Sequence, residues 1–123
     1  MTPLKQKISA KTARVAVIGL GYVGLPLALA IRDAGFFVSG IDTDSKKITL
    51  LKAKKSYIDD IADAEVKNAI NSQKFAPTDS FAALRVSDIV IIAVPTPLDK
   101  YKVPDLTYIK KAVQSASLHL HKN

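Results

Sequence analysis

One short glycine loop constrains this chain more than any other feature. All five glycines of the 123 residues lie between positions 19 and 40, and three of them fall in the hexapeptide Gly19-Leu20-Gly21-Tyr22-Val23-Gly24. An apolar run (15–18) precedes the loop, an apolar stretch long enough for a helix (25–34) follows it, and a second apolar run ends at Asp42. This order of strand, glycine turn, helix, strand and acid is typical of a βαβ unit that binds a dinucleotide.

Each glycine of the loop has a separate physical role. Gly19 allows a tight turn, Gly21 lets the backbone approach a pyrophosphate, and Gly24 lets the following helix pack closely on the strand. The N-terminus of that helix presents unpaired N–H groups and the positive end of its dipole to phosphates. A glycine turn that binds nothing would explain the turn, but not the acid after the second strand.

Asp42 indicates which dinucleotide is bound. Its carboxylate can accept hydrogen bonds from both hydroxyls of an adenosine ribose, and it would repel a 2′-phosphate, so the sequence favours NAD over NADP. Lys46 and Lys47 follow closely and could tolerate a phosphate. We interpret Lys46 as part of a solvated helix face, whereas Lys47 could return to the ribose.

Composition excludes several classes of protein. The chain is 48% hydrophobic, which suits one globular domain, but it has no run near the ~20 apolar residues that a membrane-spanning helix needs. Its net charge of +7 comes from scattered lysines and arginines, with no nucleic-acid-binding motif, so we expect no nucleic-acid or membrane partner. There is no cysteine and no apolar signal segment, so a cytoplasmic protein is the simplest interpretation.

The pattern predicts a flexible leader (1–12) and a Rossmann-like α/β domain (13–123) with a doubly wound parallel sheet. We expect the strand order 3-2-1-4, with the chain truncated before a fifth strand. Pro77 places the third strand at an edge. The expected strands are 14–19, 36–42, 75–78 and 88–94, and the expected helices are 22–34, 45–55, 61–73 and one from 105 onward, with a brief helical turn at 80–84.

Three segments should meet at one crevice. The glycine loop, Asp42 and the segment Val94-Pro95-Thr96-Pro97 each follow a strand, and the carboxyl ends of parallel strands lie at the same edge of a sheet. Strands one and four are neighbours that the chain leaves in opposite directions, so the crevice opens there. Thr96, fixed between two prolines, is the polar side chain outside the glycine loop that we expect in the site.

The residue pattern offers no catalytic group and no metal site. His119 and His121 are two positions apart, so they do not share a helix face and make a poor metal pair. Asp59 and Asp60 are adjacent and point apart, and a helix N-cap explains them better than a carboxylate pair.

Several strings together resemble the UDP-glucose/GDP-mannose dehydrogenase family over about residues 13–120. They are VAVIGLGYVGLPLA (15–28), GID with Lys47 (40–42), SYIDDI (56–61), DIVIIAVPTP (88–97) and PDLTYI (104–109). The VPTP string followed by PDL is most similar to the branch that oxidises UDP-N-acetylhexosamines such as UDP-N-acetylglucosamine.

The resemblance implies NAD-dependent oxidation of a UDP-sugar C6 alcohol to a carboxylate with two NAD. It also implies that Asp42 and Lys47 lie at the ribose, the Gly21-Tyr22-Val23 backbone at the pyrophosphate, and Thr96 near the nicotinamide half. The cysteine thiolate that holds the family's intermediate lies beyond the matched stretch, and this chain has no cysteine. The chain therefore resembles the first third of such an enzyme, and alone it should be inactive.

Three other interpretations stay open. The parent enzyme could be a UDP-glucose 6-dehydrogenase, or another NAD-dependent dehydrogenase of the hydroxyacid type. The chain could also be a non-enzymatic NAD-binding module. For the enzyme we expect a UDP-sugar substrate and a homo-oligomer.

Overall fold

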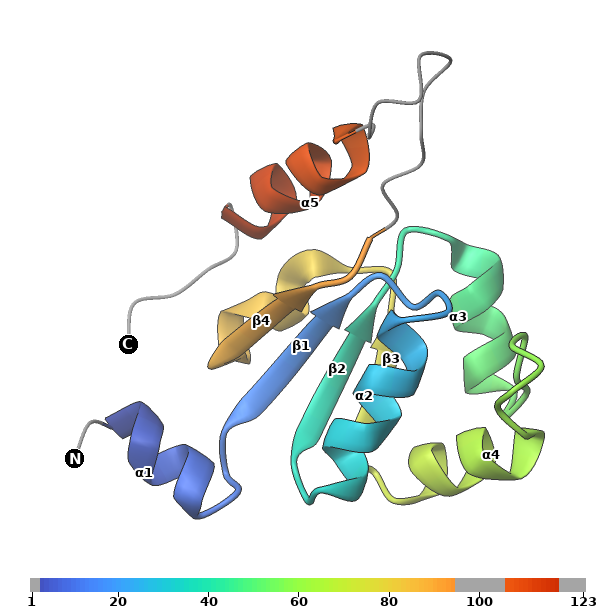
Figure 1. The fold of residues 1–123 in the computed structure, drawn as a ribbon, viewed down its shortest axis with the longest axis horizontal. Coiled ribbons are helices and arrows are strands. Elements are labelled where there is room, and N and C mark those ends of the chain that lie inside the picture. The colour runs from blue at the N-terminus through green and yellow to red at the C-terminus, as the bar shows by residue number, and fades with distance from the viewer. Residues whose placement is uncertain (1–2, 95–105, 118–123) are drawn as a thin grey trace.

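The sheet has four parallel strands in the order β3-β2-β1-β4, as predicted (Figure 1). The computed structural model describes residues 3–94 and 106–117, apart from the side chain of Tyr108. The strands are β1 (Arg14–Ile18), β2 (Phe37–Ile41), β3 (Phe75–Thr78) and β4 (Ile89–Ile92). Pro77 lies in β3, which is an edge strand of this sheet, so its missing N–H costs no ladder bond.

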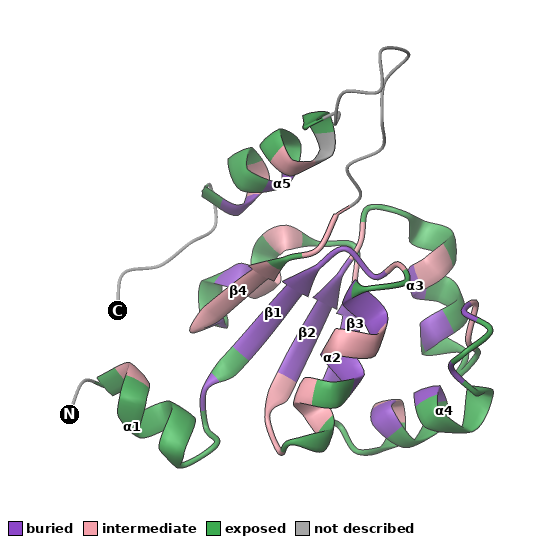
Figure 2. Ribbon diagram, viewed as in Figure 1, coloured by how far each residue is buried: buried purple, intermediate pink, exposed green. Residues whose placement is uncertain are grey.

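Strand β1 forms the centre of the sheet and is buried along almost its whole length (Figure 2). Ile18, its last residue, pairs with Ile41 of β2 and Ile92 of β4, so the three strands end at the same level. The chain then continues from each of them on one edge of the sheet. This alignment brings the glycine loop, Asp42 and Val94 to a common place.

Successive residues of β1 serve two different core clusters, as the pleat of a strand requires. Val15 and Val17 face the cluster beneath α2 (Gly24–Asp33), α3 (Ser45–Lys52) and α4 (Asp63–Asn71). Ala16 and Ile18 face the cluster that includes residues of η1 (Phe81–Val86) and α5 (Thr107–Ser117). Helices therefore cover both faces, which explains why β1 is an uninterrupted apolar run.

Helix α2 ends in the manner expected for a glycine after a helix. Gly35 has a positive φ of 105°, its N–H donates to the carbonyl of Arg32 at 2.9 Å, and the N–H of Phe36 donates to Ile31 at 3.4 Å. These two bonds form a Schellman motif. The helix begins at Gly24 rather than at the expected residue 22, so the residues before it belong to the loop.

The expected flexible leader contains a helix, α1 (Pro3–Ser9), and none of its residues is buried. Proline is favoured at the first position of a helix, and the lysines and glutamine that follow are good helix formers. The Lys7 ammonium also lies 2.8 Å from a carboxylate oxygen of Asp88, just before β4. The leader segment is thus connected to the sheet.

The second edge of the sheet generates a prediction about association. Within the described residues β4 pairs only with β1, and Ile92 is 36% exposed. An apolar edge strand with unpaired backbone groups is a template for pairing between chains. We expect the isolated 123-residue chain to self-associate, measured as a sedimentation coefficient that rises with concentration.

Ile92→Lys should return the chain to a monomer, because a charge on the edge opposes pairing. Ile8→Lys, at a similarly exposed apolar position of α1, is the matched control and should leave association unchanged. A wild-type chain that stays monomeric at high concentration, with freely exchanging amides in β4, would contradict the expectation.

Candidate functional site

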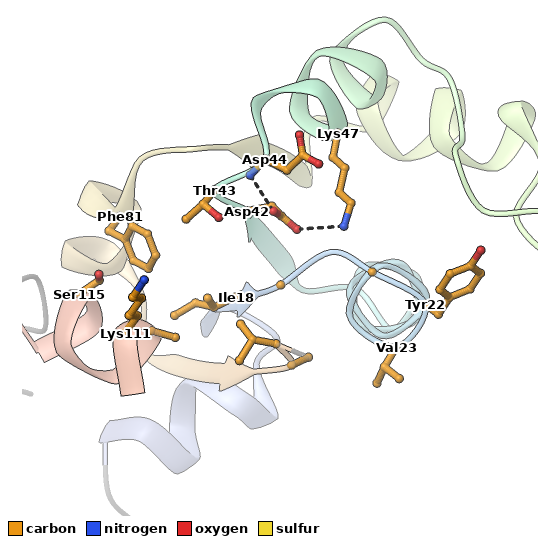
Figure 3. Close-up of a pocket in the computed structure, with 15 residues that line it drawn as sticks. Ile18, Tyr22, Val23, Asp42, Thr43, Asp44, Lys47, Phe81, Lys111 and Ser115 are labelled. Atoms are coloured by element: carbon orange, nitrogen blue, oxygen red, sulfur yellow. Dashed lines mark hydrogen bonds and ion pairs between the residues drawn. The ribbon is translucent and has the colours of Figure 1, made fainter. Parts of the chain in front are cut away.

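A cavity of about 1020 Å³ lies at the carboxyl ends of β1, β2 and β4 (Figure 3). Its volume is at the upper end of the range of small-molecule and cofactor pockets. Most of the residues expected to bind a cofactor line it, namely Gly19, Gly21, Tyr22, Val23, Asp42, Lys47 and Val94. The crevice predicted from the strand order is therefore present at the predicted place.

Gly19 and Gly24 determine how tightly the loop turns. Gly19 has a φ of 97°, and a Cβ there would lie 2.7 Å from the carbonyl oxygen of Ala93 after β4. A Cβ at Gly24 would lie 1.6 Å from the carbonyl oxygen of Gly19. Neither position can accept a side chain without moving the backbone. Gly24 therefore acts by packing, and it is not among the residues that line the cavity.

Gly21 differs from both, because a Cβ at this position would meet no atom of the described residues within 4 Å. Its φ is not in the positive range that favours glycine. The fold itself therefore does not require a glycine here. Gly21 lines the cavity, and the open space at its Cβ position is consistent with close approach of a ligand to the backbone.

The start of α2 lies beside that space, although the Leu25 N–H already donates to the carbonyl oxygen of Gly21 at 3.1 Å and Pro26 has no N–H. Its N-cap residue is Val23, and no side chain among the described residues caps the helix. The N-terminus of a helix carries the positive end of its dipole. This arrangement suits a phosphate group.

The carboxylate of Asp42 holds the loop from the end of β2. Its Oδ2 accepts the Leu20 N–H at 2.9 Å, and its Oδ1 accepts the Asp44 N–H at 2.8 Å. The side chain is 12% exposed, so it borders the cavity without facing open solvent. A carboxylate has about four lone-pair sites, which leaves capacity for ribose hydroxyls.

The two lysines of α3 separate as the sequence predicts. Lys47 Nζ lies 3.8 Å from Asp42 Oδ2 and lines the cavity (Figure 3). Lys46 is exposed, and its backbone N–H donates to the side chain of Asp44, the N-cap of the helix. The cation beside the Asp42 carboxylate is therefore that of Lys47.

Tyr57, in the loop after α3, is a contact that sequence reasoning missed. Its hydroxyl donates to the carbonyl oxygen of Leu20 at 2.5 Å, and the Lys47 ammonium lies 5.7 Å from the centre of its ring. Burial raises the pKa of Tyr57 above its usual range, and the charges of Asp42 and Asp44 add to the shift. The phenol therefore remains a neutral donor.

The far wall of the cavity was also missed. Figure 3 shows Phe81 of η1 and Lys111 and Ser115 of α5 on the side opposite to Tyr22 and Val23. Only their position after β3 and β4, on the face of the second core cluster, could have indicated them. The other residues of the lining that were not anticipated are Ile18, Thr43, Asp44, Ala93 and Ala112.

Some of the remaining predicted residues lie outside the part of the chain that the structure describes. Thr96, His119 and His121 lie outside the described residues. Asp59 and Asp60 are exposed and do not line the cavity. In the described part of the chain no cluster of three or more potential metal ligands is present.

Comparison with known proteins finds relatives among the nucleotide-sugar dehydrogenases. The model of the "UDP-glucose/GDP-mannose dehydrogenase family, NAD binding domain" matches residues 13–123. UDP-glucose 6-dehydrogenase TuaD of Bacillus subtilis is 38% identical over 110 residues, which is 88% of this chain and 24% of that protein. UDP-N-acetyl-D-glucosamine 6-dehydrogenase of Pseudomonas aeruginosa is 37% identical over 112 residues, which is 91% of this chain and 26% of that protein.

Solved structures agree with this result. A ternary complex of GDP-mannose dehydrogenase from Pseudomonas aeruginosa superposes with a TM-score of 0.80 at 32% identity, covering 84% of this chain and 24% of that one. The chain thus spans about a quarter of the length of the relatives that it matches.

The two glycines at the start of α2 yield a paired prediction. Gly21→Ala should leave the free energy of unfolding within about 0.5 kcal/mol, because the new methyl group meets open space, yet it should weaken NAD binding at least tenfold. Gly24→Ala should destabilise the fold by about 1–3 kcal/mol, because its methyl group overlaps the Gly19 carbonyl. Urea unfolding and calorimetric titration with NAD measure both effects, and equal NAD affinity of Gly21→Ala and wild type would contradict the first.

The pKa of Tyr57 generates a prediction about stability at high pH. An unfolded tyrosine loses its proton near pH 10, whereas folded Tyr57 keeps it, so the folded state binds more protons and stability falls as pH rises. Tyr57→Phe does not titrate. The free energy of unfolding of wild type relative to Tyr57→Phe should therefore be constant below about pH 9 and decrease toward about pH 11. Urea unfolding of both proteins across this pH range measures the difference. A difference in the free energy of unfolding that does not change with pH would contradict the buried environment of the Tyr57 hydroxyl.

Proposed function

Because the chain belongs to the UDP-glucose/GDP-mannose dehydrogenase family and matches its NAD-binding domain, we propose that it is the cofactor-binding part of a UDP-sugar 6-dehydrogenase. In this proposal the complete enzyme oxidises the C6 alcohol of a UDP-sugar to a carboxylate with two NAD. The observation that carries it is that Gly21, with open space at its Cβ position, and Asp42 line the same cavity.

The chemistry of the residues that line the cavity fits NAD, and the volume of the cavity is large enough for a cofactor. Asp42 would accept hydrogen bonds from the adenosine ribose, with Lys47 beside it, and the backbone from Gly21 to Val23 would donate to the pyrophosphate. Val94, after β4, would border the nicotinamide half together with Thr96. Bound NAD supplies the hydride acceptor of the reaction.

For the substrate we favour a UDP-N-acetylhexosamine. The VPTP and PDL strings support this choice, and relatives named for UDP-N-acetyl-D-glucosamine and UDP-N-acetyl-D-mannosamine are 34–38% identical. UDP-glucose is the alternative, because TuaD is similar to the same degree. The substrate-binding residues would belong to parts of the enzyme that this chain does not match.

We further propose a homo-oligomer that works in the cytoplasm. Nucleotide sugars are anionic, and the net charge of +7 suits such ligands. Among the described helices none is long and apolar enough to span a membrane.

The activity is tested on the protein that the complete gene encodes. With NAD and UDP-N-acetylglucosamine, UDP-N-acetylmannosamine or UDP-glucose in separate reactions, we expect two NADH per sugar oxidised and the highest kcat/KM with an N-acetylated sugar. A preference for UDP-glucose would overturn the substrate assignment alone. No reduction of NAD with any nucleotide sugar would overturn the proposed activity.

The 123-residue chain by itself should bind NAD without turnover. It contains no cysteine that could hold an aldehyde-level intermediate. Incubation with NAD and the same sugars should give no NADH above the level of a reaction without protein. Any sustained NADH production by this chain would show that the cavity alone is a complete active site.

Removal of the Asp42 carboxylate should weaken NAD binding. A hydrogen bond to a charged group contributes about 1.5–3 kcal/mol, so Asp42→Ala should raise the Kd for NAD at least tenfold and change the Kd for NADP less. Asp60→Ala removes the same charge from an exposed position outside the cavity and is the matched control. Identical calorimetric titrations of Asp42→Ala and wild type with NAD would place the ribose elsewhere.

A further inference from the structure

Leu20 has an unusual position within the glycine loop, because side chains from two other segments hold both of its backbone groups. It is fully buried between Gly19 and Gly21. Its N–H donates to Asp42 at 2.9 Å, and its carbonyl oxygen accepts the hydroxyl hydrogen of Tyr57 at 2.5 Å. A buried carbonyl needs a partner, and here the partner comes from a residue 37 positions away.

The planarity of the peptide bond gives this contact a consequence for the cavity. The carbonyl of Leu20 and the N–H of Gly21 belong to one trans peptide unit, so they point in opposite directions. A bond that fixes the carbonyl therefore also fixes the direction of the Gly21 N–H. Gly21 lines the cavity, and within the part of the chain that the structure describes no atom would contact a Cβ there within 4 Å.

Tyr57 is well placed to act as a rigid support. Its ring packs against the core cluster beneath α2, α3 and α4, and the Lys47 ammonium lies over the ring. Burial, with the neighbouring carboxylates of Asp42 and Asp44, raises the pKa of Tyr57 and keeps the hydroxyl protonated. The hydroxyl is thus a donor held in place on a packed ring.

We propose that Tyr57 is a positioning residue for the cofactor: by holding the Leu20–Gly21 peptide it presents the Gly21 N–H to the diphosphate of a dinucleotide in the cavity. This inference rests on the proposed NAD site. Tyr57 does not need to touch the cofactor, because its effect passes through one peptide plane.

The test compares Tyr57→Phe with wild type, using NAD and adenosine as separate ligands. The phenyl ring keeps its place in the core, and only the hydroxyl is lost. We expect the Kd for NAD to rise about tenfold, as for the loss of one hydrogen bond of about 1.4 kcal/mol. Adenosine has no phosphate, so its Kd, measured by NMR titration, should change less than twofold.

Ser72→Ala is the matched control. It removes a hydroxyl that also donates to a backbone carbonyl, that of Ala69 at 2.6 Å, at the end of α4 and outside the cavity. Both NAD and adenosine should bind this variant as they bind wild type. In the wild-type chain the amide signal of Gly21 should shift on addition of NAD and remain in place on addition of adenosine.

The outcomes separate the possible failures. Equal NAD affinity of Tyr57→Phe and wild type would overturn the positioning role and leave the NAD site intact. A Gly21 amide signal that does not shift on addition of NAD would have the same consequence. A parallel loss of NAD and adenosine binding in Tyr57→Phe would show that Tyr57 only stabilises the fold. Failure of the wild-type chain to bind NAD at all would overturn the cofactor site and this inference with it.

Discussion

The hydrogen bond between the Asp42 carboxylate and the Leu20 N–H is the contact on which the candidate site depends. It connects the end of β2 to the loop that follows β1, at 2.9 Å, and it satisfies a donor on a fully buried residue. An unsatisfied buried donor costs about 1–3 kcal/mol, so the loop has a strong reason to keep this shape. The close fit of the Gly19 turn against Ala93 restrains the same loop from the side of β4.

This arrangement gives one carboxylate both a structural and a binding role. Two of the sites on Asp42 already accept N–H groups, and the remaining ones border the cavity. The acid expected at the ribose is therefore oriented before any ligand arrives, with Lys47 3.8 Å away. Preorganisation of this kind lowers the entropic cost of binding, because the side chain does not have to be ordered by the ligand.

The glycines of the loop are alike in sequence but differ in what the fold requires of them. Gly19 and Gly24 have backbone atoms where a side chain would stand, whereas Gly21 has open space. Within this hexapeptide, folding and ligand binding therefore place their requirements on different glycines. In this loop the turn depends on Gly19 and Gly24, whereas Gly21 is the glycine that is left open for a ligand.

The sequence by itself determined the βαβ order, the strand order 3-2-1-4, the edge position of Pro77 and the meeting of the glycine loop with Asp42. These follow from apolar runs, turn residues and the handedness of crossovers, which are local properties of the chain. The helix at residues 3–9 was missed because a short polar helix has no apolar periodicity to reveal it. Only the tertiary structure brought Tyr57 to Leu20 and placed Phe81 and Lys111 across the cavity. The hydrogen bond from the Tyr57 hydroxyl to a backbone carbonyl 37 residues away produces no periodic pattern in the sequence. It depends on how the loops pack against each other once the sheet has formed.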